Sequence, residues 1–154
     1  METIFITPKI ISQKCRYALR AIFELASRNK EGVTKISEIA TQQAMPPRFL
    51  ENILVELKQA GFVTSRRGSE GGYMLARLAS ELTVGEVIAF IQGQHKYNFV
   101  QSASETLRNG DYAFSTLWSH LNNVISDVYD NTTFADLVEV QAKATKDYVP
   151  NYVI

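Results

Sequence analysis

A glycine-rich turn at residues 67–72 joins two short segments that have the pattern of β-strands. Three of the five positions 68–72 are glycine, which permits a tight hairpin turn. The flanking segments, FVTSR at 62–66 and YMLAR at 73–77, carry the alternation expected of half-buried strands. No Gly-Lys-Ser/Thr element opening a helix follows the turn, which argues against a nucleotide-binding P-loop. The sequence therefore predicts a β-hairpin here.

Three segments with helical periodicity precede the hairpin. They cover residues 12–29, 35–44 and 45–61, and their apolar residues recur every three or four positions. In the third segment, positions 49/50, 53/54 and 57 mark the core side, and two prolines open the helix. Gly32 and Gly61 are expected to end the first and third helices. Helix, short helix, tight turn, helix and hairpin, in that order, are typical of a winged helix-turn-helix.

Further helices are expected beyond the hairpin. Thr83 and Glu86 form a capping box for one helix, a longer helix covers residues 112–130, and Thr133 with Asp136 starts the last one. The predicted fold class is mainly α with a small β-hairpin: a winged helix-turn-helix plus a long helix. We expect three parts, namely an N-terminal extension (1–11), the winged domain (12–93) and a C-terminal part (94–154).

The formal net charge of zero conceals an uneven distribution. Residues 1–77 hold twelve Lys or Arg against seven Asp or Glu, and residues 78–154 hold four against nine, giving +5 and −5. A basic front half suits a polyanionic partner. No apolar run approaches the roughly 18 residues of a membrane span, and one cysteine excludes an intramolecular disulfide. These features indicate a cytoplasmic protein with no membrane partner.

Catalytic chemistry finds little support in the sequence. The two histidines, His95 and His120, have no nearby Ser, Cys or Asp in an arrangement that resembles a triad or a metal site. We therefore expect a protein that is not an enzyme.

The third helix of a winged helix-turn-helix enters the DNA major groove with its first turn leading. There Arg48 is suited to pair with guanine, Asn52 with adenine, and Glu51 with the amino group of cytosine. The alternative is that these residues only form the solvated face of an amphipathic helix. The pattern by itself leaves both interpretations open.

Basic residues outside the third helix fit the same partner, double-stranded DNA. Arg66 and Arg67 at the hairpin tip are placed to reach a minor groove, whose narrow A·T-rich form concentrates negative potential. Lys14 and Arg16 are suited to hold phosphates, which fixes register without reading sequence. From the pattern alone, Lys14 and Arg16 could equally be ordinary surface charge.

Several motifs occur together and in order. They are Basic-x-Arg-Tyr-Ala in KCRYALRAIFELA, then ISEIA, Arg-Gly-x-x-Gly-Gly-Tyr in FLENILVELKQAGFVTSRRGSEGGYMLA, and Val-Gly-Glu-Val-Ile in LTVGEVI. Over residues 12–91 the chain resembles the bacterial winged-helix transcriptional regulators of the IscR, NsrR and CymR type, the Rrf2 (Rrf-two) family. With this resemblance, the candidate DNA-binding residues are Lys14, Arg16, Tyr17, Pro47, Arg48, Glu51, Asn52, Arg66, Arg67 and Ser69.

The resemblance implies a regulator, expected to be a repressor, that binds a palindromic operator as a homodimer. The recognition helix and the wing of each subunit would occupy one half-site, and the long helix near 112–130 would be the dimerisation helix. Its residues Leu117, Leu121, Val124 and Val128 form an apolar seam suited to that role. The competing interpretation is that these four residues pack only within the monomer.

The sequence departs from the family pattern at the iron–sulfur site. Many members carry three cysteines between the helix after the wing and the dimerisation helix, and residues 94–111 contain none. His95, Glu105 and Asp111 lie there, but their spacing is not diagnostic of a metal site. Cys15 occupies a first-helix position where relatives often have glycine, so it does not carry over a cluster ligand. We expect a cluster-free member with no cofactor and no metal.

The signal that such a regulator would sense is open at this stage. Tyr97, Phe99 and Tyr112 could line a small-molecule pocket or dock a partner protein, or simply belong to the core. The alternative function is therefore a regulator of the same fold whose DNA binding depends on an effector or on a partner protein.

Overall fold

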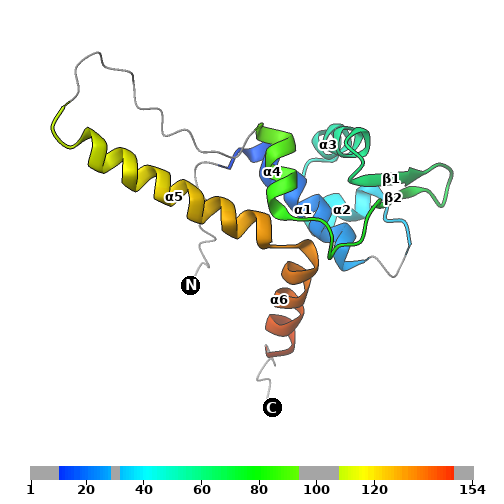
Figure 1. Cartoon of the computed structure of the whole chain (residues 1–154). Helices are drawn as coiled ribbons and strands as arrows, with labels where there is room; N and C mark the ends of the chain where they lie inside the picture. Colours follow the sequence, from blue (N-terminus) through cyan, green and yellow to red (C-terminus); the bar gives the residue numbers. More distant parts are fainter. Residues whose placement is uncertain (1–10, 29–31, 94–107, 148–154) are drawn as a thin grey trace.

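The computed structural model describes residues 11–28, 32–93 and 108–147. Within them the elements are α1 (Gln13–Ser27), α2 (Ile36–Gln42), α3 (Pro47–Gln59), β1 (Val63–Arg66), β2 (Gly72–Leu75), α4 (Val84–Gln92), α5 (Asp111–Asn131) and α6 (Phe134–Asp147). The fold is mainly α with one antiparallel hairpin, as predicted (Figure 1). The part of the chain that the structure describes holds no helix long and apolar enough to cross a membrane.

Helix α1 lies at the centre of the winged body. Helices α2, α3, α4 and α6 all pack against it, as does strand β2. The apolar face of each helix meets this centre because its apolar residues recur every three or four positions. Fully buried side chains include Ile22, Ile39, Leu50, Ile53, Leu54, Leu57, Leu82, Ile88 and Phe134.

The hairpin is the wing, and a third backbone segment fixes its base. β1 and β2 pair in register from Val63 opposite Leu75 to Arg66 opposite Gly72. Thr34, in the loop before α2, exchanges two main-chain hydrogen bonds of 2.8 Å with Tyr73. A side chain at position 72 would collide with the Thr34 carbonyl group, so only glycine allows this approach. The bridge attaches the wing to the helix-turn-helix.

Two details of the helices differ from the sequence prediction. α1 ends at Ser27, capped by the backbone N–H of Arg28, and Gly32 lies beyond the helix with φ +86°. Phe49 was expected on the core side of α3, but its side chain is 43% exposed. The N-terminal turn of α3 extends past the core, so only the four apolar residues from Leu50 to Leu57 are buried there.

The capping box predicted for α4 is present, and the helix start predicted at Thr133 and Asp136 shows the same pattern of hydrogen bonds. At the start of α4, the Glu86 N–H donates to Thr83 Oγ1 at 3.2 Å and the Thr83 N–H donates to Glu86 Oε2 at 2.9 Å. Thr133 and Asp136 make the equivalent pair of bonds at the start of α6, at 2.8 and 3.1 Å. Hydrogen bonds from the Thr133 backbone and side chain lower the pKa of Asp136. Burial alone would raise the pKa of Glu86, but hydrogen bonds from Thr83 and Arg77 outweigh it and lower that pKa.

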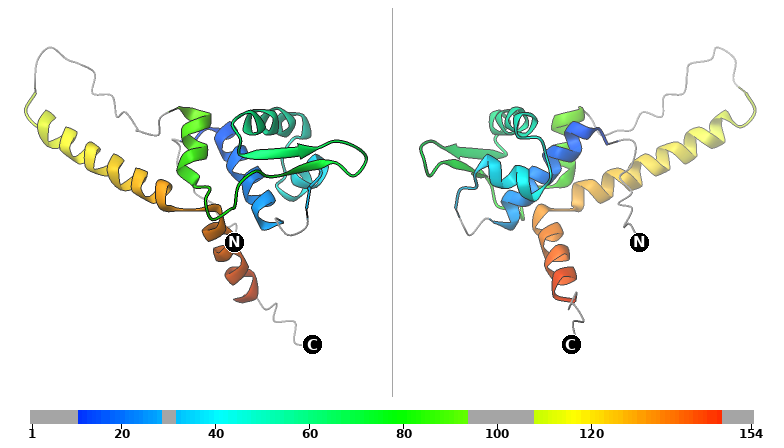
Figure 2. Two further views of the ribbon diagram at one scale, coloured as in Figure 1. Left: turned by 45° about the vertical axis from the view of Figure 1, so that its right-hand side comes forward. Right: turned by 180° about the vertical axis from the view of Figure 1, so that it is seen from behind.

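Helix α5 projects away from the winged body, and α6 begins beside that body and points in a different direction (Figures 1 and 2). No residue of α5 is buried. At the start of α6, Phe134 is fully buried and belongs to the same core as the winged domain. Helix α6 packs on α1 and so contacts the winged domain. The expected division of the chain at residue 93 stays a prediction.

The junction of α5 and α6, residues 132–135, is here called the elbow. Three main-chain hydrogen bonds join it to residues 79–84, which lead from the wing into α4. They run from Val84 N to Thr132 O at 2.9 Å, from Phe134 N to Leu82 O at 3.0 Å, and from Ala135 N to Ala79 O at 3.1 Å. Close by, Gly85 touches Asp130 so closely that a Cβ atom would lie 3.2 Å from the Asp130 Cα atom. These contacts anchor the C-terminal end of α5.

Candidate nucleic-acid interface

Helix α3 presents a polar face beside its buried one. Arg48, Glu51 and Asn52 lie within its first two turns and are exposed. Pro47 is the first helical residue, where its missing N–H needs no partner. No described residue forms a hydrogen bond or an ion pair with these three polar side chains. Within the described part of the chain, their donors and acceptors are not engaged.

The wing tip is also exposed. Arg66 closes strand β1, and Arg67 and Ser69 follow in the turn, which the Gly71 N–H closes by donating to the Gly68 carbonyl at 3.0 Å. Lys58 at the end of α3 donates to Ser65 Oγ at 2.6 Å, which ties the hairpin to α3. The exposed arginines of the tip thus belong to a hairpin that packs against α3.

Helix α1 supplies the third group of predicted DNA-binding residues, and these residues differ in their exposure and contacts. Lys14 is not free surface charge, because its ammonium group lies 2.7 Å from the Glu56 carboxylate of α3. Arg16 is exposed. Tyr17 is half-buried, and its ring packs edge-on against Phe49 with centroids 5.6 Å apart. This aromatic contact explains the exposed Phe49: it joins α1 to the leading turn of α3.

A polar network that the sequence did not reveal braces α1 against α2. Glu24 is only 8% exposed, and its carboxylate accepts from Arg28 Nε at 2.7 Å and from Gln43 Nε2 at 2.8 Å. Gln43 Oε1 in turn accepts from Arg20 Nη1 at 3.2 Å. Arg28 also contacts Glu38 of α2 at 3.0 Å. The only signal in the sequence was the four-residue spacing of Arg16, Arg20, Glu24 and Arg28, which places them along one side of α1.

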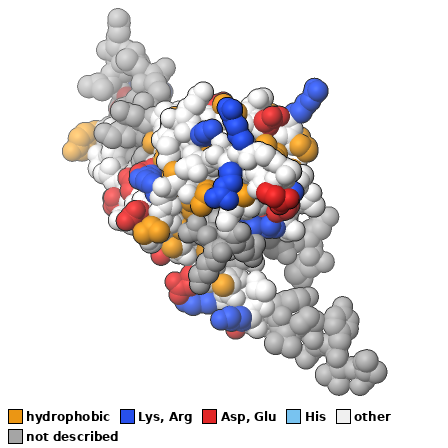
Figure 3. Space-filling view, turned by 90° about the vertical axis from the view of Figure 1, so that its right-hand side faces the viewer, with side chains coloured by type: hydrophobic (Ala, Val, Ile, Leu, Met, Phe, Trp, Pro, Cys, Tyr) orange, Lys and Arg blue, Asp and Glu red, His pale blue; other side chains and the backbone are white. Residues whose placement is uncertain are grey.

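Basic side chains gather on the face of the molecule that carries the wing, with acidic side chains between them (Figure 3). Because guanidinium and ammonium groups attract phosphates, this face suits the backbone of a nucleic acid. The residues predicted to touch DNA come from α1, α3 and the wing, and these three elements pack into one body.

The predicted seam on α5 is exposed in the single chain. Its four members, Leu117, Leu121, Val124 and Val128, are 46%, 36%, 46% and 58% exposed. Packing within the monomer therefore does not account for them in the described structure. Tyr112, Phe114 and Trp118 extend the apolar surface toward the start of α5, where the last two rings stack at 6.2 Å.

The remaining candidate residues do not form a site for a metal or a cluster in the described part of the chain. Cys15 is fully buried in the core, and burial raises the pKa of its thiol to about 11. Asp111 accepts from the backbone N–H of Arg108 at 2.7 Å, and its other oxygen lies 3.6 Å from the Arg108 guanidinium. His95, Glu105, Tyr97 and Phe99 lie outside the described residues. Across residues 11–28, 32–93 and 108–147, no three His, Cys, Asp or Glu side chains group as a metal site would require.

Comparison with known proteins agrees with this architecture. The model of the Rrf2 family, described as an iron-dependent transcriptional regulator, matches residues 11–140. The regulator CymR of Bacillus subtilis (strain 168) is 34% identical over 127 residues, which cover 82% of this chain and 88% of CymR. The regulator IscR of Serratia proteamaculans (strain 568) is 34% identical over 132 residues, covering 85% of this chain and 80% of IscR.

Solved structures show the same likeness. The structure of CymR, the global cysteine regulator of B. subtilis, superposes with a TM-score of 0.74 at 32% identity and covers 87% of this chain and 98% of CymR. IscR of T. potens gives a TM-score of 0.71 at 26% identity and 93% coverage of both chains. These relatives are transcriptional regulators and not enzymes. The chain therefore belongs to the Rrf2 family of DNA-binding winged-helix transcriptional regulators.

Proposed function

We propose that this regulator is a sequence-specific repressor that binds a palindromic operator as a homodimer. The observation that carries the proposal is the free polar face of α3, where Arg48, Glu51 and Asn52 are exposed and have no partner among the described residues. Arginine, glutamate and asparagine are the side chains that recognise base edges in the major groove. When bound to its operator, such a repressor would occupy promoter DNA that RNA polymerase needs.

The homodimer is supported by the exposed seam on α5. Four aliphatic residues at spacings of four, three and four positions form a stripe along one side of the helix. Exposed apolar stripes of this kind mark protein interfaces. A second copy of the same helix is a self-complementary partner, as two-fold symmetry requires. The two winged domains would then face two half-sites spaced by about 34 Å or a multiple of it.

We further propose that the protein works without an iron–sulfur cluster, although the family description refers to iron. Cluster irons are held chiefly by thiolates. The chain has one cysteine, and Cys15 is fully buried with a raised pKa, so the ligands present do not fit a cluster. Protein purified without oxygen should therefore lack the visible absorption of a cluster; an intense band would contradict this proposal.

The function can be tested by incubating the protein with fragmented genomic DNA at low and at raised salt and sequencing the retained fragments. Enrichment of a few promoters that share an inverted repeat, surviving the salt step, is the expected result. If all fragments are retained equally at low salt and lost at raised salt, the result would show only non-specific binding of DNA to a basic surface, driven by counterion release. That outcome would contradict sequence-specific binding by the free protein.

A second candidate is a regulator of the same fold that needs an effector or a partner protein. The exposed aromatic side chains at the start of α5 favour it: Tyr112 is 87% exposed and Phe114 is 58% exposed, beyond the aliphatic seam. This candidate predicts weak, non-specific DNA binding by the purified protein and specific binding after addition of a cell extract.

A further inference from the structure

A cleft of about 530 Å³ opens between the start of α1 and the end of α2. Six side chains that line it are Gln13, Arg16, Tyr17, Arg20, Gln42 and Gln43. The lining residues include two guanidinium groups, three carboxamides and one phenol, but no carboxylate. Every ionised group in this lining is therefore positive, and the rest are hydrogen-bonding groups. Such a lining suits an anion with several acceptor oxygens.

The two guanidinium groups are positioned to act together. Arg16 and Arg20 are four residues apart on α1, so they lie on the same side of the helix. Arg20 is held by a relay: its Nη1 donates to Gln43 Oε1 at 3.2 Å, and Gln43 Nε2 donates to the carboxylate of Glu24 at 2.8 Å. Because Glu24 accepts the amide N–H, the amide oxygen faces Arg20. The relay uses one of the five guanidinium donors and leaves the others for a ligand.

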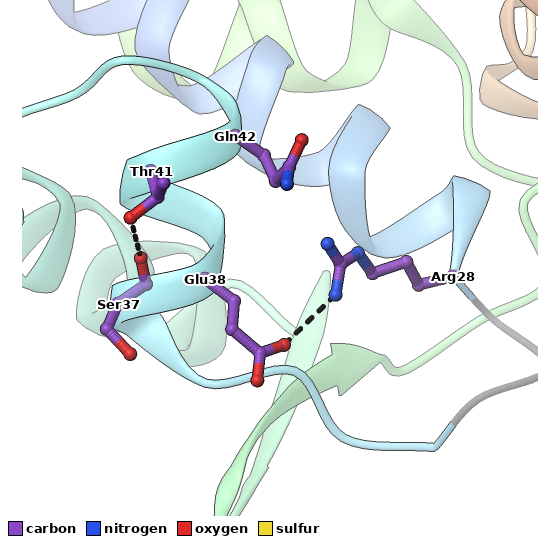
Figure 4. A pocket seen from close by; sticks show the side chains of 5 residues that line it. All are labelled: Arg28, Ser37, Glu38, Thr41 and Gln42. Carbon is purple, nitrogen blue, oxygen red and sulfur yellow. Dashed lines mark hydrogen bonds and ion pairs between the residues drawn. The ribbon is translucent and has the colours of Figure 1, made fainter.

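A neighbouring cleft contains an arginine whose charge is already balanced by carboxylates. It has a volume of about 400 Å³ and is lined by Arg28, Ser37, Glu38, Thr41 and Gln42 (Figure 4). There the Arg28 guanidinium reaches across to Glu38 at 3.0 Å and also contacts Glu24 at 2.7 Å. Its positive charge is already balanced by two carboxylates, so Arg28 is part of the brace between α1 and α2. Among the described residues, no carboxylate pairs with Arg16 or Arg20 in this way.

The charged cleft also lies beside the leading end of α3. Gln43 and Ala44 of its lining belong to the turn between α2 and α3, and Tyr17 packs on Phe49 in the first turn of α3. A helix that enters the major groove has phosphates on either side of it, and contacts to those phosphates position the protein.

We propose that the cleft binds a phosphate of the DNA backbone, with Arg20 contacting that phosphate together with Arg16. Gln43 and Glu24 are positioning residues that orient the Arg20 guanidinium. The inference rests on the proposed function and adds a contact that the pattern of the sequence did not indicate. Arg20 fixes the depth and register of α3 in the groove and reads no base.

The test compares three variants of the full chain on a duplex recovered from the genomic selection, with affinity measured across a range of salt concentrations. Arg20→Gln removes one charge in the cleft, and Lys143→Gln removes one charge from α6, where Lys143 is 71% exposed and pairs with Glu139. Arg20→Lys keeps the charge but not the fork of donors. Thermal melting of each variant verifies that it is folded.

One lost phosphate contact reduces the magnitude of the slope of log affinity against log salt by about 0.9 for each subunit. We expect this reduction for Arg20→Gln, with an unchanged base preference, and the wild-type slope for Lys143→Gln and Arg20→Lys. Replacing single phosphates by neutral methylphosphonates should weaken the wild type at one position in each half-site, and Arg20→Gln should be insensitive at that position.

The outcomes separate the two proposals. If the wild type binds with a steep salt dependence but Arg20→Gln keeps the full slope, the cleft is not a phosphate site, while the proposed function stands. If Arg20→Gln and Lys143→Gln lower the slope equally, only net charge matters and the assignment of the cleft is wrong. If the genomic selection yields no specific duplex, or the wild type shows no salt-dependent binding to it, the proposed function fails, and the phosphate contact fails with it.

Discussion

Cys15 lies at the end of the first turn of α1 with its side chain entirely inside the core. The thiol is close in sequence to Lys14 and Arg16, which would favour a thiolate electrostatically at an exposed site. In the structure, burial dominates and raises the pKa of the thiol to about 11. Cys15 is therefore a packing residue.

Cys15 is predicted to react with iodoacetamide at pH 8 at least about 100-fold more slowly in the folded protein than in denaturant. The rise in its pKa from 9.0 to about 11 lowers the thiolate fraction by that factor. The folded pKa exceeds the unfolded one, so this group also makes the fold less stable as the pH rises through 9.0 to about 11. Equal labelling rates in the two states at pH 8 would show that the thiol is accessible.

Arg67 and Asn52 are predicted to affect DNA binding in different ways. Arg67→Ala should weaken operator binding by about 1–3 kcal/mol, the usual cost of one specific contact, because the wing then loses its minor-groove charge. Asn52→Ala should relax base preference at one position of each half-site. Binding to a set of single-base operator variants measures both effects. An unchanged affinity for Arg67→Ala would argue against the wing contact.

At the level of elements, the tight turn between α2 and α3 contains an unusual backbone. Ala44 has φ +49°, in the left-handed region that residues with a Cβ atom rarely adopt. The Met45 N–H donates to the Ala40 carbonyl at 2.9 Å, so the turn is hydrogen-bonded as well as strained. This turn sets the angle between α2 and α3.

Ala44→Gly is predicted to raise the free energy of unfolding by about 0.5–1 kcal/mol, because glycine adopts the left-handed conformation without the steric cost. The matched control is Ala60→Gly at the end of α3, where φ is −78° and the backbone is right-handed. There the same substitution should lower stability by about 0.5–1 kcal/mol. Denaturant titration measures both, and the same sign at both positions would contradict the argument from backbone strain.

The elements themselves were largely predictable, because their signals are local. Thr83 with Glu86 and Thr133 with Asp136 mark helix starts by a spacing of three residues, and the structure shows both capping boxes. The pairing of Thr34 with Tyr73 and the relay from Glu24 to Gln43 were not predictable. They join residues that are far apart in the chain, and no periodic pattern encodes such contacts. The exposed position of Phe49 was missed for the same reason, since its partner is Tyr17 of another helix.

For the whole molecule, the proposed homodimer assembles through α5. Leu121→Asp is predicted to convert the dimer into a monomer, because it places a charge in the middle of the apolar seam, where a dimer would bury it. Light scattering should give twice the chain mass of 17.3 kDa for the wild type and 17.3 kDa for the variant.

Leu78→Asp serves as the control for the seam. Leu78 is 59% exposed but lies in the segment between the wing and α4, outside α5. It should leave the mass unchanged. Loss of the dimer in both variants would indicate a general effect of the added charge and not a specific interface on α5.

Gly85→Ala is predicted to lower the free energy of unfolding by about 1–3 kcal/mol, the usual cost of overpacking. The added Cβ atom would lie 3.2 Å from the Asp130 Cα atom, and closer still to the Asp130 carboxylate, so α5 must shift away from α4. Alanine ordinarily stabilises a helix relative to glycine. A gain in stability in a denaturant titration would therefore show that α4 and α5 do not pack as described.

The elbow has a consequence for mutational mapping. Its three bonds to residues 79–84 are made by main-chain N–H and carbonyl groups, so an alanine substitution removes none of their donors or acceptors. If a structural change passes from α5 to the wing through the elbow, substitutions of side chains alone would not reveal these main-chain contacts. Only a change in the backbone, such as proline at position 135, deletes one of these bonds, and the first turn of a helix tolerates proline. The connection between α5 and the wing thus depends on the course of the backbone at the elbow as well as on the side chains packed around it.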